Sequence, residues 1–186
     1  MAIRSRGSYN VEVKFEGNWF KFNEVVNSTN VLMAMAARQG QREFAEEYKN
    51  RLQKNIRTGG KRFGYQGLSP KYLAWKLNRN GPSSLLNWSG AFASSIEVRE
   101  NRNGKRFMVG IPKGEKRPYY FSTDANKLTI SEYANVLEHG TSNIPERPIF
   151  ADTFSKDMGG KYALKKFIEL SLIKRFGERG VIVTRI

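Results

Sequence analysis

Hydrophobic and polar residues alternate in two short segments near the two ends of the chain. Residues 9–15 read Tyr-Asn-Val-Glu-Val-Lys-Phe, and the apolar residues of 181–186 are spaced in a similar way. Such alternation is typical of a strand with one buried face. Because Glu-Gly-Asn at 16–18 is a turn signal, we predict that residues 19–22 form the return strand of a hairpin.

A four-residue period replaces this alternation in the following segment. The apolar positions that recur in it are Phe44, Tyr48, Leu52 and Ile56. Charged residues lie between them, so the pattern predicts a long helix with one buried stripe and one solvent-exposed face. We expect Ser28 or Thr29 to cap its first turn and Gly59-Gly60 to end it.

Local end signals mark the next elements. Ser69-Pro70 predicts the start of a short helix, with serine as the cap and proline in the first turn. Asn-Gly at 103–104 predicts a hairpin between strands at 95–99 and 106–111.

The C-terminal half contains two more helical patterns. Residues 130–139 form one predicted helix, which Gly140 ends. Another stripe with a period of four consists of Phe150, Phe154 and Met158. Gly159-Gly160 interrupts this region, and the helical pattern resumes over 162–176.

Helices that precede and follow a hairpin predict an α+β fold with a small antiparallel sheet. The length of 186 residues fits a single domain. We expect residues 1–27 to form an N-terminal strand pair or arm. Residues 28–186 would form the α+β domain, with a long N-terminal helix, the hairpin and C-terminal helices.

The composition excludes several classes of protein. The chain has no Cys and one His, so it has no disulfide, no thiol nucleophile and no Cys or multi-His metal site. No apolar run approaches the roughly 20 residues that cross a bilayer, and the first residues lack the apolar core of a signal peptide. We therefore expect a soluble protein of the cytoplasm, with no membrane contact and no cofactor.

The net charge of +15 is concentrated in the middle of the chain. Residues 51–117 hold fifteen basic and three acidic residues, a net of +12. A solubilising surface does not need such clustering. The clustering therefore favours contact with a polyanion or with an acidic partner.

Motifs for catalysis are incomplete in this sequence. Glu12-Val13-Lys14 has the Glu-x-Lys form of many metal-dependent nucleases, but no Asp or Glu precedes it. Gly59-Gly60-Lys61 lacks the spacing and the hydroxyl of a nucleotide-binding loop. His139 lies at a predicted helix end, where capping is the simpler role. We expect that the protein is not an enzyme.

Basic and aromatic residues are interleaved at 61–65, which read Lys-Arg-Phe-Gly-Tyr. Phe63 and Tyr65 could stack on nucleic-acid bases or pack in the core, and the sequence leaves both open. We expect Tyr72 and Trp75 to fill the core beneath the short helix.

Two segments carry a family resemblance. Residues 133–141 read Tyr-Ala-Asn-Val-Leu-Glu-His-Gly-Thr, and residues 145–150 read Pro-Glu-Arg-Pro-Ile-Phe. They resemble the Tyr-Ala, Glu-x-Gly-Thr and Pro-x-Arg-Pro-Phe runs of tail completion and minor tail component proteins of tailed bacteriophages, with one extra Ile before Phe. Residues 85–96, Leu-Leu-Asn-Trp-Ser-Gly-Ala-Phe-Ala-Ser-Ser-Ile, are similar to a run that precedes a hairpin in phage virion morphogenesis proteins. Together the resemblance covers about residues 30–176.

The resemblance implies a structural virion protein of the neck, where the tail meets the head, with a role in tail completion or head–tail joining. Proteins of this kind form rings, commonly six-fold, around the DNA channel. Their neighbours are tail terminator, tail tube or head-side connector proteins. The chain would be found in the virion after assembly in the host cytoplasm. The competing interpretation is a free-standing protein that binds nucleic acid without sequence specificity.

If the protein forms a ring, the basic residues of 51–117 would face a defined neighbour. In this setting, six basic residues would face either the phosphate backbone of packaged DNA in the lumen or an acidic ring of a neighbouring protein. These residues are Arg57, Lys61, Arg62, Arg102, Lys105 and Arg106.

The tail completion motif also makes physical sense as a turn between two helices. Gly140 suits the left-handed conformation that ends a helix, Thr141 can hydrogen-bond within the turn, and Pro148 presets the next helix. We further expect Glu138 to pair with Arg147 and so to pin the turn. These roles are structural and not catalytic.

Overall fold

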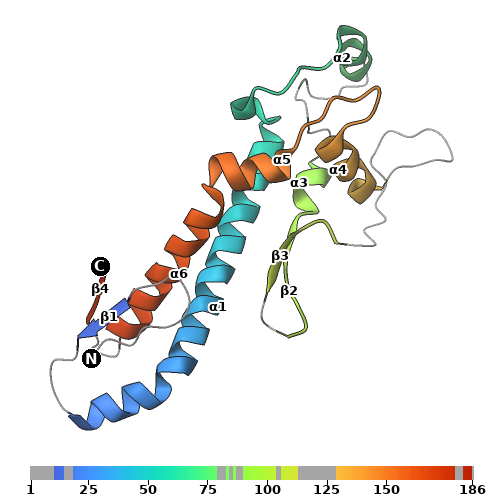
Figure 1. Cartoon of the computed structure of the whole chain (residues 1–186). Helices are drawn as coiled ribbons and strands as arrows, with labels where there is room; N and C mark the ends of the chain where they lie inside the picture. Colours follow the sequence, from blue (N-terminus) through green and yellow to red (C-terminus); the bar gives the residue numbers. More distant parts are fainter. Residues whose placement is uncertain are drawn as a thin grey trace.

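The structure, a computed structural model, describes residues 11–14, 19–78, 83, 86, 90–103, 106–112, 129–178 and 182–185. It confirms the predicted α+β single domain, with a long N-terminal helix, an antiparallel hairpin and C-terminal helices (Figure 1). The helical elements are α1 (Trp19–Arg57), η1 (Lys61–Phe63), α2 (Pro70–Leu77), α3 (Ala91–Ser94), α4 (Ile130–His139), α5 (Ile149–Asp152), the π-helical turn η2 (Thr153–Asp157) and α6 (Gly160–Gly177). The strands are β1 (Val11–Lys14), β2 (Glu97–Glu100), β3 (Phe107–Gly110) and β4 (Ile182–Arg185).

Helices α1 and α6 run antiparallel, side by side, and form a two-helix arm (Figure 1). At Gly40 their backbones approach so closely that a Cβ would lie 2.6 Å from the Cα of Ile168. Any side chain there would push the helices apart, so this glycine sets their spacing. A small core lies in the N-terminal half of α1 and the C-terminal half of α6, made of Leu32, Ala36, Leu172 and Phe176.

Strand β1 confirms the alternation at the start of the chain, and β4 confirms the alternation at its end. The two strands pair with each other in antiparallel register, with Val13 opposite Val183. The predicted hairpin partner at 19–22 is therefore wrong.

Residues 19–22 form the first turn of α1 instead, and the expected caps Ser28 and Thr29 lie inside that helix. Trp19, Phe22 and Val26 are also three and four residues apart, which is a helical spacing. A four-residue run cannot separate this spacing from strand alternation. Helix α1 thus continues through residue 27, where we expected an N-terminal arm to end.

The larger core lies where the C-terminal end of α1 meets α3, α4 and α5. Its buried side chains are Leu52, Ile56, Leu86, Phe92, Ala93, Ile96, Ile130, Ala134, Leu137 and Ile149. Tyr48 packs against this core, and Phe44, one turn earlier in α1, is also buried. The predicted stripe of α1 is therefore confirmed along its whole length.

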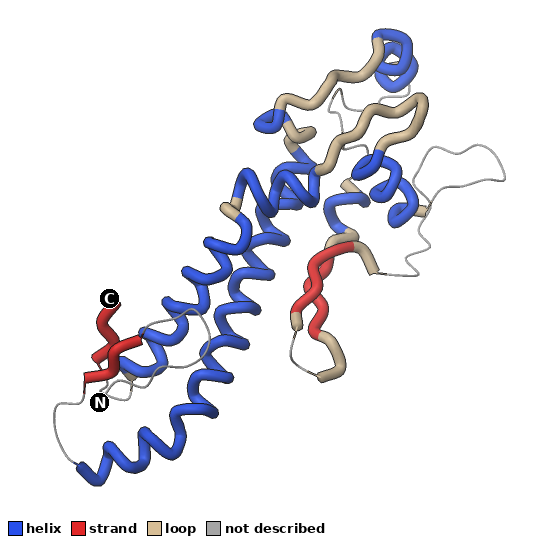
Figure 2. The backbone as a smooth tube through the Cα atoms, viewed as in Figure 1, coloured by secondary structure: helices blue, strands red, loops and turns tan. Residues whose placement is uncertain are grey.

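The predicted hairpin is confirmed by β2 and β3, with Val98 opposite Val109. Figure 2 shows this strand pair beside α1, separate from the β1–β4 pair at the chain ends. Arg38 of α1 forms an ion pair with Glu100 of β2 at 2.7 Å, which locates the hairpin along the helix.

The local end signals are confirmed for three helices. Ser69 caps α2 by accepting a hydrogen bond from the Tyr72 amide, and Pro70 begins the helix. Helix α4 spans the predicted residues, although its cap is Thr129, which forms a capping box with Glu132. Gly159, in the left-handed region, separates η2 from α6.

Candidate functional site

The turn between α4 and α5 requires glycine at Gly140. This residue has φ 68° and ψ −179°, a backbone conformation that is essentially restricted to glycine. A Cβ would lie 2.9 Å from the Glu146 amide nitrogen and 3.0 Å from the Ile144 carbonyl oxygen. The chain therefore folds back directly against the end of α4. Gly140 ends the helix as predicted, but its ψ of −179° differs from the left-handed helical conformation that we expected.

Thr141 closes the same turn. Its amide donates to the Ile144 carbonyl at 2.8 Å. Its Oγ1 accepts hydrogen bonds from the amides of Asn143, at 3.3 Å, and Ile144, at 3.1 Å. The local hydrogen bonding predicted for Thr141 is therefore present.

Glu138 links the end of α4 to the start of α5, but not in the expected way. Its carboxylate accepts from the amides of Phe150 at 3.1 Å and Ala151 at 2.9 Å. These amides belong to the first turn of α5, where helical geometry leaves N–H groups without partners and favours a negative charge. Pro148 directly precedes this turn. The expected Glu138–Arg147 pair is not made, because both carboxylate oxygens are already engaged at the helix start.

Arg147 is buried instead, with 5% of its surface exposed. Its amide donates to the Leu137 carbonyl at 2.7 Å, and its Nη2 donates to the Gln66 carbonyl at 3.3 Å. Arg147 therefore ties the turn both to α4 and to the loop before α2. Burial lowers the pKa of its guanidinium below the ordinary value for arginine.

The first group of predicted basic contacts lies at the C-terminal end of α1. Arg57 and Lys61 are exposed there, and no ion pair involves either of them in the described part of the chain. Arg62 is different, because it forms an ion pair with Asp157 and lies over the Phe63 ring. One of the predicted contacts is thus engaged inside the molecule.

Asp157 is the centre of a buried polar network that the sequence did not reveal. Its side chain is 3% exposed and accepts from Asn55 at 2.9 Å and from Arg51 at 3.1 Å, besides Arg62. Burial alone would raise the pKa of the Asp157 carboxyl. The hydrogen bond from Asn55 and the charges of Arg62 and Arg51 outweigh burial, and the pKa is lowered.

The second group lies at the end of the hairpin, where Arg102 and Arg106 are exposed. Lys105 lies outside the described residues. The hairpin meets α1 at Arg38, nineteen residues before Arg57, which corresponds to about 28 Å of helix. The described basic residues therefore form two separate groups and not one continuous patch.

The aromatic residues of 61–65 pack on the protein itself. Phe63 and Tyr65 lie against the larger core, and the Tyr65 hydroxyl donates to Asp152 at 3.0 Å. Tyr72 stacks on Trp75 with ring centroids 5.4 Å apart, yet 40% of Tyr72 is exposed. The expectation that Tyr72 fills the core is therefore wrong.

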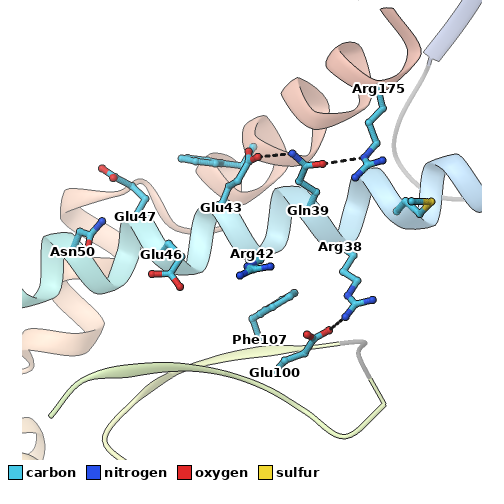
Figure 3. Close-up of a pocket in the computed structure, with 12 residues that line it drawn as sticks. Arg38, Gln39, Arg42, Glu43, Glu46, Glu47, Asn50, Glu100, Phe107 and Arg175 are labelled. Carbon is cyan, nitrogen blue, oxygen red and sulfur yellow. Dashed lines mark hydrogen bonds and ion pairs between the residues drawn. The ribbon is translucent and has the colours of Figure 1, made fainter. Parts of the chain in front are cut away.

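A groove of about 900 Å³ separates α1 from the hairpin and reaches α6 (Figure 3). Figure 3 shows Arg38 directed toward Glu100, and Gln39 between Glu43 and Arg175, at 2.8 and 3.0 Å. Arginines and glutamates both line it, with Arg38 and Arg42 followed along α1 by Glu43, Glu46 and Glu47. Among the described residues no cluster of three or more acidic or His side chains could hold a metal ion. Mixed charges of this kind suit contact with another protein surface.

The arm also exposes large apolar side chains. Val31 and Met35 of α1 are 61% and 47% exposed and lie one turn apart. Leu170 and Ile173 of α6, together with Met108 of β3, are similarly exposed. Exposed apolar stripes on a folded chain are typical of protein–protein contact surfaces.

No protein-family model, curated protein or solved structure matches this chain. None of the helices in the described ranges has the length and apolar character that crossing a membrane requires.

Proposed function

We propose that this protein is a structural component of the neck of a tailed bacteriophage. In this role it forms part of a homo-oligomeric ring, six-fold by the family pattern, around the DNA channel, for tail completion or head–tail joining. We assign it no enzymatic activity, and its partners are neighbouring tail terminator, tail tube or connector proteins and packaged DNA.

The α4–α5 turn is the observation that carries this proposal. The motif residues Glu138, Gly140 and Thr141 make the contacts that set the angle between α4 and α5. Gly140 occupies a glycine-only conformation in contact with backbone atoms. The resemblance to tail completion proteins therefore involves residues on which this fold depends, and not exchangeable surface positions.

The exposed surfaces support an assembling subunit. The arm presents Val31, Met35, Leu170 and Ile173 to solvent, and the hairpin presents Met108. In a ring, head-to-tail contacts between unlike surfaces would cover such residues.

The exposed cations support contact with a polyanion. Arg57 and Lys61 are exposed at the C-terminal end of α1, and Arg102 and Arg106 are exposed at the end of the hairpin. Cations in these places can contact phosphates without reading sequence, or an acidic neighbouring protein. The same cations favour the second candidate, a free-standing non-specific nucleic-acid-binding protein.

Deletion of the gene from the phage that encodes it separates these functions. The neck assignment predicts DNA-filled heads and detached tails in lysates, and rescue of infectious particles when the wild-type chain is supplied in trans. Attached tails in the deletion strain would refute the assignment. If those particles were normal and the isolated chain bound short DNA at physiological salt, the second candidate would take its place.

A further inference from the structure

A second concave site lies beside the α4–α5 turn. Its cavity of about 670 Å³ is formed by the loop before α2, the first turn of α2, one face of α4 and the turn residues 143–147. The volume is within the range of pockets that hold small ligands or short peptide segments.

Arg147 forms the polar part of this cavity. Its Nε is buried and has no hydrogen-bond acceptor, and among the described residues its Nη2 donates to the Gln66 carbonyl at 3.3 Å. None of the described residues that line the cavity is acidic. No charge among them therefore compensates this guanidinium.

The buried carboxylates Asp152 and Asp157 do have opposite charges beside them. Asp152 accepts from Lys156 at 2.8 Å, and Asp157 accepts from Arg51 and Arg62. A buried charge without such a partner is strongly destabilising, and a buried donor without an acceptor calls for an explanation. An anion that enters the cavity would supply the missing opposite charge.

The walls indicate what the anion is attached to. Leu68, Pro70, Ile144 and Pro145 give the cavity apolar sides. Tyr72 forms part of the exposed rim, and it lies close enough for Arg147 to oppose the effect of burial on its pKa. An apolar group beside a single negative charge fits these walls.

We propose that this cavity binds a peptide carboxylate, from an acidic side chain or a chain terminus, with an apolar side chain next to it. The guanidinium of Arg147 attracts the carboxylate, since the two groups match in charge. A single cation balances a monoanionic carboxylate. DNA phosphates lie on a wide, rigid duplex and do not reach a side chain that is 5% exposed. The partner is thus an acidic segment of another protein, and the inference does not depend on the neck assignment.

Nitrogen-15 NMR of the full chain tests this proposal with three probes. N-acetyl-L-leucine carries the carboxylate and an apolar side chain, N-acetyl-L-leucinamide is its neutral counterpart, and inorganic phosphate is the alternative anion. We expect N-acetyl-L-leucine to shift the Arg147 Nε–H resonance and the Gly67 and Asn143 amides saturably, with a roughly millimolar dissociation constant. The neutral amide should bind at least about tenfold more weakly, the factor that separates binding free energies by about 1.4 kcal/mol.

Two variants and a control accompany these titrations. Arg147→Met removes the charge and should abolish the amide shifts. Tyr72→Ala changes the exposed rim, keeps Arg147, and should weaken binding at least about threefold even if Arg147→Met fails to fold. Arg102→Gln, on the hairpin, should leave binding unchanged.

Three results would overturn the proposal. The first is the absence of a saturable shift with N-acetyl-L-leucine, and the second is a shift of equal size with the neutral amide. The third is a lower dissociation constant for phosphate than for the carboxylate. The last result would assign the cavity to phosphate-bearing ligands instead of peptides.

Discussion

Asp157 connects α1, η1 and η2 through one carboxylate. Its partners Asn55, Arg51 and Arg62 are about a hundred residues away in sequence. Nothing in the local pattern around Asp157 predicts such a network, because each pair depends on how α1 and η2 pack. The sequence had assigned Arg62 to a DNA or partner contact, and the structure shows that it also has this internal role.

The lowered pKa of Asp157 gives a pH-dependent prediction. We expect Asp157→Asn to reduce the free energy of unfolding by about 1–3 kcal/mol at neutral pH, because charge-assisted hydrogen bonds to a buried carboxylate are lost. The folded-state pKa is depressed, so this stability is present above the unfolded pKa of about 3.9. It is lost as the pH falls through the folded value.

Urea unfolding of both proteins between neutral and acidic pH measures this difference. The gap between wild type and variant should shrink below about pH 4. The exposed pair of Glu97 with Arg99 provides the control, since Glu97→Gln should change stability little at any pH. A gap that does not vary with pH would contradict the role assigned to Asp157.

Gly64 provides a comparison for Gly140 in the α4–α5 turn. Both have a positive φ, 68° and 67°, but ψ is −179° at Gly140 and 29° at Gly64, and a Cβ at Gly64 would meet nothing within 4 Å. We expect Gly64→Ala to cost roughly 1–2 kcal/mol from the left-handed conformation alone. Gly140→Ala should cost about 1–3 kcal/mol more, because its backbone conformation is essentially restricted to glycine and its Cβ would meet backbone atoms. Thermal unfolding measures both variants, and equal losses would contradict the special requirement for glycine at Gly140.

At the scale of elements, Gly40 determines how closely α1 and α6 pack. We expect Gly40→Ala to destabilise the arm by about 1–3 kcal/mol, because a Cβ 2.6 Å from the Ile168 Cα forces the backbones apart. Gly177→Ala, in the last turn of α6 with nothing within 4 Å, is the control and should be neutral or slightly stabilising. Hydrogen exchange of the α6 amides locates the effect. Unchanged protection in Gly40→Ala would mean that the helices are not in close contact there.

Element ends were predictable where their signals are local. Ser69-Pro70 and Gly140 each act within a few residues, so the sequence identified the start of α2 and the end of α4. The partner of β1 was not predictable in this way, because β4 lies at the other end of the chain. The spacing of the four residues at 19–22 fits both a strand and a helix. Only the helical pattern of the residues that follow them in α1 assigns them to a helix.

At the scale of the whole molecule, the described candidate contact residues of the basic stretch separate into two groups. The end of α1 carries Arg57 and Lys61, and the hairpin carries Arg102 and Arg106, about 28 Å apart along α1. The sequence predicted which residues are basic and exposed, but not their separation. The two groups are separate because the hairpin contacts α1 at Arg38, well before Arg57 in the same helix.

Salt-dependent DNA binding by the isolated chain tests each group. If Arg102 and Arg106 contact phosphates, the double variant Arg102→Gln/Arg106→Gln should lower the slope of log Kobs against log salt by about 1.8, at roughly 0.9 for each phosphate contact. The double variant Arg57→Gln/Lys61→Gln should lower this slope by a similar amount. Arg62→Gln is the control, because its partner is Asp157, and it should change the slope least. Unchanged slopes for both double variants would indicate that these cations meet an acidic protein and not DNA.

The central claim is that this chain is a structural part of the phage neck. Quantitative mass spectrometry of purified, DNase-treated particles tests it most directly. The neck assignment predicts peptides of this chain in intact virions, at a small, fixed number of copies per particle that matches one ring. Absence of the chain from intact particles, with other neck proteins detected in the same sample, would contradict the assignment.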